Sequence, residues 1–561
     1  MSGPHRLTAP PAGFGAQLDG AEPASFRFGG RNYTGCYGDT LASGLLAAGV
    51  SVWSASPRLG RPRGLMGLAL DDAALLALGG DSGAWSAAPA DEIVLREAMS
   101  ARRVVPAGAD AATLTGGRTL LPAGRRLLET LRRSLPLPAP RLAPPRPLPP
   151  ARRDACDVVV IGAGLAGLAA AAAARAAGLD VRVVEASRRA GGVADLFGGR
   201  IEGLSLKAWA DAQAAALGDL LVANATAIAI GADGAVTVIE RTDASRPSEV
   251  ALRVISAGAV VLATGSRERP LIFADNDRPG VLLSCAARAL LRRQAIAPGE
   301  RVVVATTSDD GYRTAVDLKQ AGVTVELVLD ARENPQGAAV DLAKAQGLPL
   351  SLFSVVTGVD YDPARGGLVG VRAQNRFGEG VSAGARTLTA DALIVSGGFA
   401  PRDELARRCG LGEAQGVFVA AGPDAARAVA EGWAAGTAAA SRLAAEVDAA
   451  APEVSATSDE PDDGVAGYLE RLDPAFADAA FVDIGADVTA ADVFAAAEAG
   501  ALGPEALARR LGLGGGLDGG RLSADLPARL FATIGAGRPP APSPGRPTLG
   551  LLAARAGLRN A

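Results

Sequence analysis

Three glycines at the end of an apolar run are the residues of this sequence best suited to chemistry. Residues 157–167 read DVVVIGAGLAG, so an expected strand leads directly into Gly162-x-Gly164-x-x-Gly167 and then into an alanine-rich helix. In such a pattern the first glycine permits a tight turn, the second lets backbone approach a pyrophosphate, and the third lets helix and strand pack closely. The helix N-terminus favours the negative charge of that pyrophosphate. The spacing therefore predicts a dinucleotide-binding turn.

An acidic residue stands where the ribose of a dinucleotide would lie. The run VRVV, after Gly178, is an expected second strand, and Glu185 follows it, 18 residues beyond Gly167. A carboxylate at this place accepts bonds from a ribose 2′-hydroxyl and repels a 2′-phosphate. NAD or FAD is therefore favoured over NADP, although Arg188 and Arg189 oppose that preference.

The glycine pattern has meaning only in this strand-to-helix context. With 71 glycines in 561 residues, a chance match is expected about once. A second copy at Gly514, Gly516 and Gly519 follows the helical run ALARRLGL and opens no helix. We interpret that copy as a flexible loop.

Two further strand ends are expected beside the first turn. VVLATGSRERP (260–270) and DALIVSGGFAPR (391–402) each place glycine just past an apolar run, where backbone can approach a cofactor. The candidate cofactor-binding residues are Gly162, Ala163, Gly164, Leu165, Ala166, Gly167, Glu185, Ala186, Gly192, Ala227, Thr264, Gly265 and Gly398.

A second strand–helix–strand unit is predicted from Arg301, with Asp330 at the end of its second strand. Its turn lacks the glycine triad and has Thr306, Ser308 and Gly311 instead. Two interpretations stay open: a packing domain with a degenerate site, or a working NAD(P)H site.

The sequence offers few groups for acid–base or metal chemistry. The only histidine is His5, which we expect to be an ordinary residue of a mobile N-terminus. The four cysteines, 36, 156, 285 and 409, form no CxxC pair, so we predict neither a metal site nor disulfides. We predict no catalytic residue in this chain.

Net charge and hydropathy limit which partners and which cellular compartment we expect for this chain. The net charge of −4 gives no overall reason to bind nucleic acid or an acidic membrane. The longest apolar run, from Leu165 to Ala174, is too short to span a membrane, and the N-terminal residues do not resemble a secretion signal. With its unpaired cysteines, the chain is expected to be cytoplasmic.

The elements outside the motif organise the chain into blocks. The runs SFRFGG and RNYTGC predict a hairpin around Gly29 and Gly30, followed by a helix capped by Asp39 or Thr40. GRRLLETLRRSL (124–135) predicts a basic amphipathic helix, either a solvated arginine face over packed leucines or a partner-docking helix. Between two linkers, β-branched runs alternate with alanine-rich stretches, which predicts a parallel sheet with helices on both faces.

Four segments of the sequence show a closer resemblance to a known family. They are FRFGGRNYTGCYGDTLASGLLAAGV, RPRG (61–64), RPLIFADNDRPGVLLSCAARALL (269–291) and FVDIGADVTAADV (481–493). Together they resemble, in order and over nearly the whole chain, the α subunits of heterotetrameric sarcosine oxidases. Those subunits belong to the two-dinucleotide-binding-domain flavoprotein superfamily.

The resemblance implies an α/β fold with a defined domain order. That order is a cluster-free ferredoxin-like β-grasp domain (1–134), a Pro-rich linker (135–153), an FAD/NAD(P)-binding domain (154–450) with an inserted second Rossmann-like unit (about 299–390), a linker (451–465), a small helical domain (466–538) and a Pro-rich tail (539–561).

It also implies a function. The chain would be the NAD-binding α-type subunit of a multisubunit enzyme that oxidises an N-methylated or secondary amine, and would not be catalytic alone. The flavin chemistry would take place mainly in a β-type partner, with small subunits completing a heterotetramer. FAD is the alternative at the 162–167 motif, and FMN would lie at the contact with the partner.

The departures from the family shape further expectations. Gly60 replaces the usual histidine before RPRG, and the loop around Gly514 replaces a basic glycine-rich string. No cysteine follows RPRG or lies near the FVD segment, so we expect no iron–sulfur cluster. The sequence stops at Ala561, where family members continue into a folate domain, so we expect no folate chemistry.

Two other functions stay open at this point. One is a self-sufficient FAD-dependent NAD(P)H oxidoreductase, with FAD at Gly162–Gly167 and NAD(P)H at Thr306–Gly311. The other is a structural scaffold subunit whose dinucleotide pocket is empty.

Overall fold

The structure is a computed structural model, and it divides into two compact units that are each described by themselves. Unit 1 comprises Met1–Pro145, Glu268–Gly398 and Asp462–Ala561, and unit 2 comprises Arg146–Arg267 and Phe399–Pro461. The described residues are 5–18, 22–69, 74–79, 85–103, 150–242, 250–377, 381–382, 386–422, 424–455, 474–500, 503–516, 518–523 and 526–533. The predicted domain 154–450 is thus divided between the units, and its inserted part, 268–398, is longer than the expected 299–390.

Unit 2 is built on one mixed sheet with the strand order β12-β9-β8-β15-β14-β13, and β27 also pairs with β15. β8 runs parallel to β9 and β15, whereas β13, β14 and β15 form an antiparallel meander. The strands are β8 (Arg152–Ile161), β9 (Val181–Val184), β12 (Leu221–Val222), β13 (Ala225–Ile230), β14 (Ala235–Arg241), β15 (Val250–Leu262) and β27 (Val417–Val419).

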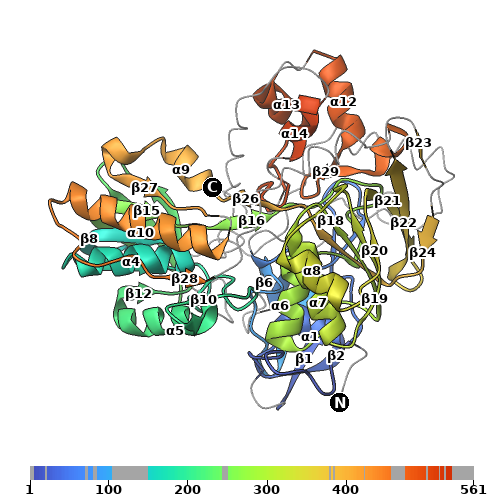
Figure 1. The fold of residues 1–561 in the computed structure, drawn as a ribbon, viewed down its shortest axis with the longest axis horizontal. Helices are drawn as coiled ribbons and strands as arrows, with labels where there is room; N and C mark the ends of the chain where they lie inside the picture. The colour runs from blue at the N-terminus through green and yellow to red at the C-terminus, as the bar shows by residue number, and fades with distance from the viewer. Residues whose placement is uncertain are drawn as a thin grey trace. The chain divides into compact units, whose positions relative to one another are not determined.

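The two faces of this sheet are covered differently. Val158 and Val160 pack with three helices, α4 (Leu165–Ala176), α5 (Leu206–Leu217) and α10 (Ala425–Arg442), and Figure 1 shows α4 and α10 lying side by side. Val159 and Ile161, on the opposite face, pack with residues of the meander and of the short helix α9 (Glu404–Cys409). Helices on both faces were expected, but the meander takes most of the second face.

The remaining elements of this part of the chain are short. They are η2 (Gly218–Leu220), η3 (Glu413–Gln415), β10 (Arg200–Ile201), β11 (Leu204–Ser205), β16 (Ser266–Glu268), β26 (Phe399–Pro401) and β28 (Val454–Ser455). β28 pairs with β10, so part of the predicted linker 451–465 is a strand. The predicted linker 135–153 likewise ends inside β8.

Unit 1 begins with a β-grasp arrangement, in which a sheet of order β2-β1-β7-β5-β6 carries the helix α1. The predicted hairpin is confirmed, with Gly29 and Gly30 at positive φ, and so is the helix, whose N-cap is Thr40. The predicted helix 124–135 lies outside the described residues. The elements are β1 (Pro23–Phe28), β2 (Arg31–Cys36), α1 (Leu41–Ala47), β3 (Ser54–Ala55), β4 (Pro62–Arg63), β5 (Leu75–Gly79), β6 (Trp85–Pro89) and β7 (Met99–Arg103).

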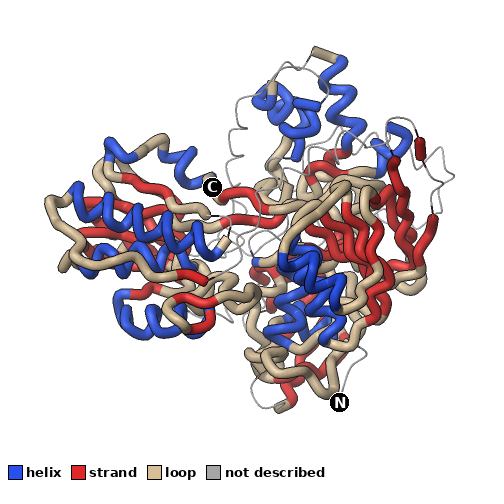
Figure 2. The backbone as a smooth tube through the Cα atoms, in the orientation of Figure 1, coloured by secondary structure: helices blue, strands red, loops and turns tan. Residues whose placement is uncertain are grey.

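A second, parallel sheet of order β17-β25-β18-β19-β20 forms the centre of unit 1. The predicted unit from Arg301 is confirmed as β18 (Arg301–Thr306), α7 (Asp309–Gln320) and β19 (Thr324–Asp330), with Gly322 at positive φ in the turn. Figure 2 shows the helices of this part packed in front of its strands. The other elements are β17 (Val281–Leu283), α6 (Ser284–Gln294), α8 (Ala338–Ala345), β20 (Leu350–Ser351), β21 (Ser354–Asp362), β22 (Gly367–Phe377), β23 (Val381–Ser382), β24 (Arg386–Leu388) and β25 (Ala392–Ser396).

The C-terminal block of unit 1 is small and mostly helical, as expected. Its elements are η4 (Pro474–Ala479), β29 (Phe481–Asp483), β30 (Val488–Thr489), α12 (Ala490–Glu498), α13 (Pro504–Leu511) and α14 (Leu526–Thr533). The glycine loop after α13, interpreted from sequence as flexible, is packed against the β29–β30 turn. The Gly514 N–H donates to Asp483 (2.8 Å), and a Cβ on Gly516 would overlap the backbone of Gly485.

Candidate dinucleotide site

The turn between β8 and α4 has the geometry that its three glycines predict. Gly162 has φ +105°, which disfavours other residues, and its N–H donates to the Val184 carbonyl of β9 (2.7 Å). A Cβ on Gly162 would overlap the Ala263 carbonyl, and a Cβ on Gly167 would overlap the Gly162 carbonyl. The first and third glycines therefore allow close backbone packing within the protein.

Gly164 differs from these two glycines because its environment is open. Its φ of −75° suits any residue, and a Cβ built on it would meet no atom within 4 Å. Space at this position, directly before the first turn of α4, is what the approach of a pyrophosphate requires. Gly164 is also the N-cap of α4 and has no side chain to satisfy the first N–H groups of the helix, which lack partners within the helix. The amides of Leu165, Ala166 and Gly167 are thus placed to bind an anion.

Helix α10 determines where the start of α4 lies. Gly432 and Gly436, one turn apart on α10, contact α4 so closely that a Cβ on either would overlap the carbonyl of Ala166 or Ala170, respectively. Sequence reasoning missed this support, although its signal, the Gly-x-x-x-Gly spacing, is present in the sequence.

The Glu185 carboxylate forms a hydrogen bond with the backbone of the glycine turn. The side chain is 8% exposed; its Oε2 accepts from the Ala163 N–H (2.7 Å) and its Oε1 from the Ser187 N–H (2.7 Å). The contact with Ala163 places the predicted ribose-binding carboxylate at the glycine turn. Each carboxylate oxygen can accept a second bond, so a ribose hydroxyl can bind without breaking the first.

The loop 186–192 lines the same turn. The Gly191 N–H donates to the Ala163 carbonyl (2.7 Å), and a Cβ on Gly192 would lie 3.3 Å from the Gly164 Cα. The Ala186 carbonyl accepts from Arg241 (3.1 Å), which fixes the segment after Glu185.

Of the other predicted residues, only some lie beside the glycine turn. Thr264 lies beside Gly162, since a Cβ on Gly162 would be 3.4 Å from the Thr264 N, and the Thr264 hydroxyl donates to the Arg402 carbonyl (2.5 Å). The Gly265 carbonyl accepts from the Arg402 N–H (2.9 Å). Ala227 lies on β13 at a bulge. Gly398 belongs to unit 1, where its carbonyl accepts from the Arg269 N–H (2.9 Å), so the structure does not assign it to this turn.

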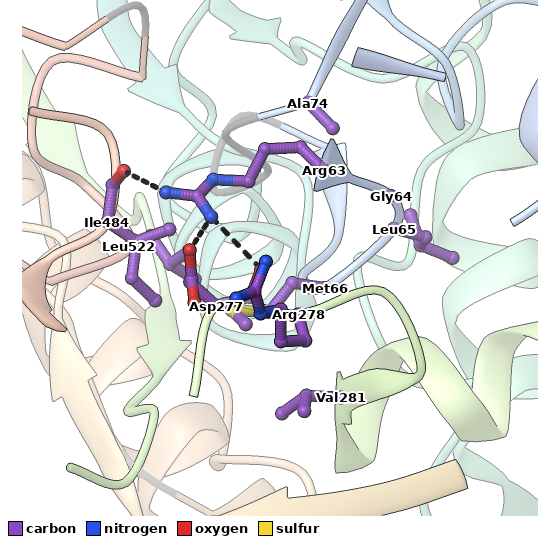
Figure 3. Close-up of a pocket in the computed structure, with 10 residues that line it drawn as sticks. All are labelled: Arg63, Gly64, Leu65, Met66, Ala74, Asp277, Arg278, Val281, Ile484 and Leu522. Carbon is purple, nitrogen blue, oxygen red and sulfur yellow. Dashed lines mark hydrogen bonds and ion pairs between the residues drawn. The ribbon is translucent and has the colours of Figure 1, made fainter. Parts of the chain in front are cut away.

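A small cavity in unit 1 does not provide a second candidate. Arg63, 4% exposed, lies at the wall of this cavity and pairs with Asp277 (Figure 3). Arg63 also pairs with Asp487 (2.8 Å). Burial lowers the pKa of Arg63 to about 10. Arg278, also at this wall, pairs with Asp275 (3.0 Å), so both arginines that line the cavity already have carboxylate partners.

Three side chains of metal-ligating type also meet in unit 1. Ligand atoms of Glu268, Cys285 and Asp310 lie within 4.8 Å of one another, and all three residues are buried. Glu268 accepts from the Cys285 N–H (2.8 Å), and Asp310 pairs with Arg288 (2.6 Å). Each of these two carboxylates thus has at least one partner within the protein.

His5, expected in a mobile N-terminus, contacts unit 1 through its backbone. Its carbonyl accepts from the Ala297 N–H (2.8 Å), so the described N-terminal residues pack on unit 1. None of the candidate dinucleotide contacts described above involves this histidine.

Comparisons with known proteins identify the family of this chain. Residues 156–451 match the pyridine nucleotide-disulphide oxidoreductase family, and this segment contains the glycine turn, Glu185 and the second parallel sheet. The chain belongs to that family and carries an oxidoreductase domain.

More specific relatives are α subunits of sarcosine oxidases. The one from Rhizobium meliloti (strain 1021) is 31% identical over 90% of this chain and 54% of the relative. That from Corynebacterium sp. (strain P-1) is 32% identical over 69% of this chain and 38% of the relative. One subunit of the opine oxidase of Agrobacterium tumefaciens (strain Ach5) is 28% identical over 46% of this chain and 55% of the relative. The chain thus spans about half or less of the length of these relatives.

A solved structure shares the whole fold. L-proline dehydrogenase from P. horikoshii superposes with a TM-score of 0.66 at 18% identity, covering 96% of this chain and 98% of that chain. At this identity the likeness shows the architecture alone.

The N-terminal block matches a 2Fe-2S iron–sulfur cluster binding domain over residues 21–104. Such clusters are held by four cysteines, and this segment contains only Cys36. The residues do not fit a cluster, although the β-grasp fold is retained. Among the helices in the described part of the chain, none is both long and apolar enough to cross a membrane.

Proposed function

We propose that this chain is the dinucleotide-binding α-type subunit of a multisubunit, sarcosine-oxidase-like enzyme that oxidises an N-methylated or secondary amine. The observation that carries the proposal is the open space at Gly164, in front of the uncapped start of α4 and beside Glu185. Relatives named as components of sarcosine and opine oxidases support a place in a complex with other chains.

Each part of the turn has a defined role in holding the ligand. The N–H groups of Leu165–Gly167 bind the pyrophosphate, and the Glu185 carboxylate accepts from the adenosine ribose. The anionic carboxylate disfavours a 2′-phosphate, so NAD is the proposed ligand and FAD the alternative. When bound, either molecule supplies a ring that can accept a hydride.

The amine chemistry is assigned mainly to a partner. The sequence has one histidine, His5, and none of the candidate dinucleotide contacts described above involves it, so no imidazole base is assigned to the glycine turn. In this proposal a separate, flavin-bearing β-type chain supplies the oxidising flavin. Small subunits complete a heterotetramer, and FMN lies at the contact with the β-type chain. The four cysteines are free, which agrees with a cytoplasmic complex.

Purification of the chain alone and together with its partner subunits tests this proposal. Amine-dependent dye reduction is measured first, and the nucleotides released by denaturation are then identified by chromatography. We expect the chain alone to release NAD and to oxidise no amine, while the complex contains flavin and oxidises sarcosine or a related secondary amine. A yellow chain that alone reduces dye with NAD(P)H would support the self-sufficient reductase instead. Absence of any nucleotide from both samples would support the scaffold.

A further inference from the structure

The second parallel sheet of unit 1 has the topology of another dinucleotide site. In a strand–helix–strand unit of this kind, the phosphates lie at the helix N-terminus and an acid at the end of the second strand binds ribose. The corresponding places here are the first turn of α7 and Asp330, which ends β19. Both places are occupied by contacts among the protein's own side chains.

The turn before α7 is filled by a threonine. The Thr306 hydroxyl donates to the Ser308 carbonyl (2.6 Å) and accepts from the Ser308 N–H (3.0 Å). The Ser308 hydroxyl lies 3.1 Å from that of Ser396, at the end of β25. A Cβ on Gly311 would overlap the Thr306 side chain. Ser308, whose hydroxyl contacts Ser396, thus stands at the position that Gly164 leaves open in the β8–α4 turn, so a phosphate cannot approach the backbone in the same way.

Two acidic side chains, each paired with an arginine, occupy the start of α7, the place of a phosphate. Asp309 and Asp310 lie in its first turn, where an anionic ligand would bind. Asp310 is 1% exposed and pairs with Arg288, and Glu268, 5% exposed, adds a carboxyl group within 4.8 Å. Burial, followed by the charge of Asp310, raises the pKa of Glu268 to about 8. The first turn of α4, by contrast, contains no acidic residue.

The carboxylate in the ribose position is also occupied. Asp330 is fully buried and accepts from the Tyr312 hydroxyl (2.8 Å) and from the Arg332 guanidinium (2.9 Å). Arg332 pairs with Asp309 as well (2.9 Å). Arg332 thus binds both Asp330, in the ribose position, and Asp309, in the phosphate position.

We infer that the second parallel-sheet domain is closed to dinucleotides by these side chains, with Arg332 holding the carboxylate that a ribose would use. Of the two strand–helix–strand units in the described part of the chain, the one at residues 162–167 then remains open to a dinucleotide. The second parallel sheet would then hold no nicotinamide that could act as a source of electrons. The inference concerns unit 1 and does not depend on the identity of the ligand in unit 2.

Binding stoichiometry tests the inference. The full-length chain, freed of bound nucleotide, is titrated by equilibrium dialysis with labelled NAD, NADPH and FAD. Gly164→Val fills the open space without backbone strain, and Gly367→Val, where a Cβ also meets no atom within 4 Å, is the matched control. We expect one site per chain in the wild type and in the control, and a loss of at least 90% of binding in Gly164→Val.

Other outcomes separate the two proposals. Two sites in the wild type, or one site that survives in Gly164→Val, would overturn the inference. No binding in the wild type would contradict the proposed function and agree with the closed second domain. Asp309→Asn provides a test that does not require Gly164→Val to fold: dinucleotide affinity should stay within twofold of wild type, and a larger change would contradict the inference.

Discussion

At the scale of single residues, Glu185 contributes to the stability of the turn and, in the proposed function, to recognition of the ligand. Its two oxygens accept from the backbone N–H groups of Ala163 and Ser187. A buried N–H that loses its acceptor costs about 1 to 3 kcal/mol. The same carboxylate therefore contributes to the fold of unit 2 and, in the proposed function, to the choice of NAD over NADP.

Glu185→Gln is expected to weaken both functions. An amide has one acceptor oxygen and cannot accept from both N–H groups, so the free energy of unfolding of unit 2 should fall by about 1 to 3 kcal/mol. Dinucleotide affinity should fall about 10-fold or more, measured by isothermal titration calorimetry. Glu413→Gln, an exposed change in the same unit, is the control. Unchanged affinity and stability in Glu185→Gln would contradict the role assigned to this carboxylate.

The residues of the site were predicted unevenly from sequence. Gly162, Gly164, Gly167 and Glu185 follow from spacing, because their functions are local to one strand–turn–helix segment. The contact of Gly191 with Ala163 was missed, because nothing in the spacing of that loop shows which way it turns. Gly398 has the same local pattern as Gly265 but folds into the other unit, which a local pattern cannot reveal.

At the scale of elements, the close contact between α10 and α4 positions the anion-binding end of α4. Only glycine at positions 432 and 436 allows this approach, since any side chain would overlap α4 carbonyls. Ala435 and Ala439 are buried in the same core, so the buried face of α10 consists of small residues apart from Val429. A shift of α10 would move the N–H groups at the start of α4.

Gly436→Val tests this support. We expect the free energy of unfolding of unit 2 to fall by about 1 to 3 kcal/mol, which is the usual cost of extra methyl groups in a packed core. Dinucleotide affinity should fall as well. Chemical denaturation and a binding titration measure the two effects. Ala434→Val lies on the exposed side of the same helix and should change both by less than about 0.5 kcal/mol. Equal effects of the two variants would contradict the packing argument.

The elements themselves were largely predictable. Both strand–helix–strand units were predicted because apolar runs, alanine-rich helices and glycine turns follow one another at short range. The meander on the second face of the sheet in unit 2 was not, because β15 is a 13-residue strand that pairs on one side with β8 and on the other with β14 along its first half and with β27 near its end. Such pairings depend on contacts far apart in the sequence.

At the scale of the whole molecule, three buried acids of unit 1 link its stability to pH. Burial raises the pKa of Asp91 and of Asp483 to about 7 and that of Glu268 to about 8. These carboxyl groups favour the folded state in their protonated form, because ionisation in a buried place is costly. Unit 1 should therefore lose stability as these groups ionise.

Stability measurements as a function of pH test this expectation. A carboxyl group whose pKa is raised in the folded state stabilises fully below the unfolded pKa, about 4, and loses that contribution as the pH rises to the folded pKa. We expect unit 1 to lose stability between about pH 4 and pH 8, and Glu268→Gln to lose less over that range, by on the order of 1 to 3 kcal/mol. Urea denaturation monitored by hydrogen exchange resolves the two units. Parallel pH curves for wild type and variant would contradict the prediction.

At this scale, the central claim concerns unit 2 alone. The claim is that a dinucleotide is bound by the glycine turn and the start of α4 in unit 2. Hydrogen–deuterium exchange of the full-length chain, with and without NAD or FAD, tests it most directly. The account predicts slower exchange of the amides of residues 163–168 when ligand is present, and no change at residues 306–312. Unchanged exchange at 163–168, under conditions where the chain binds the nucleotide, would contradict it.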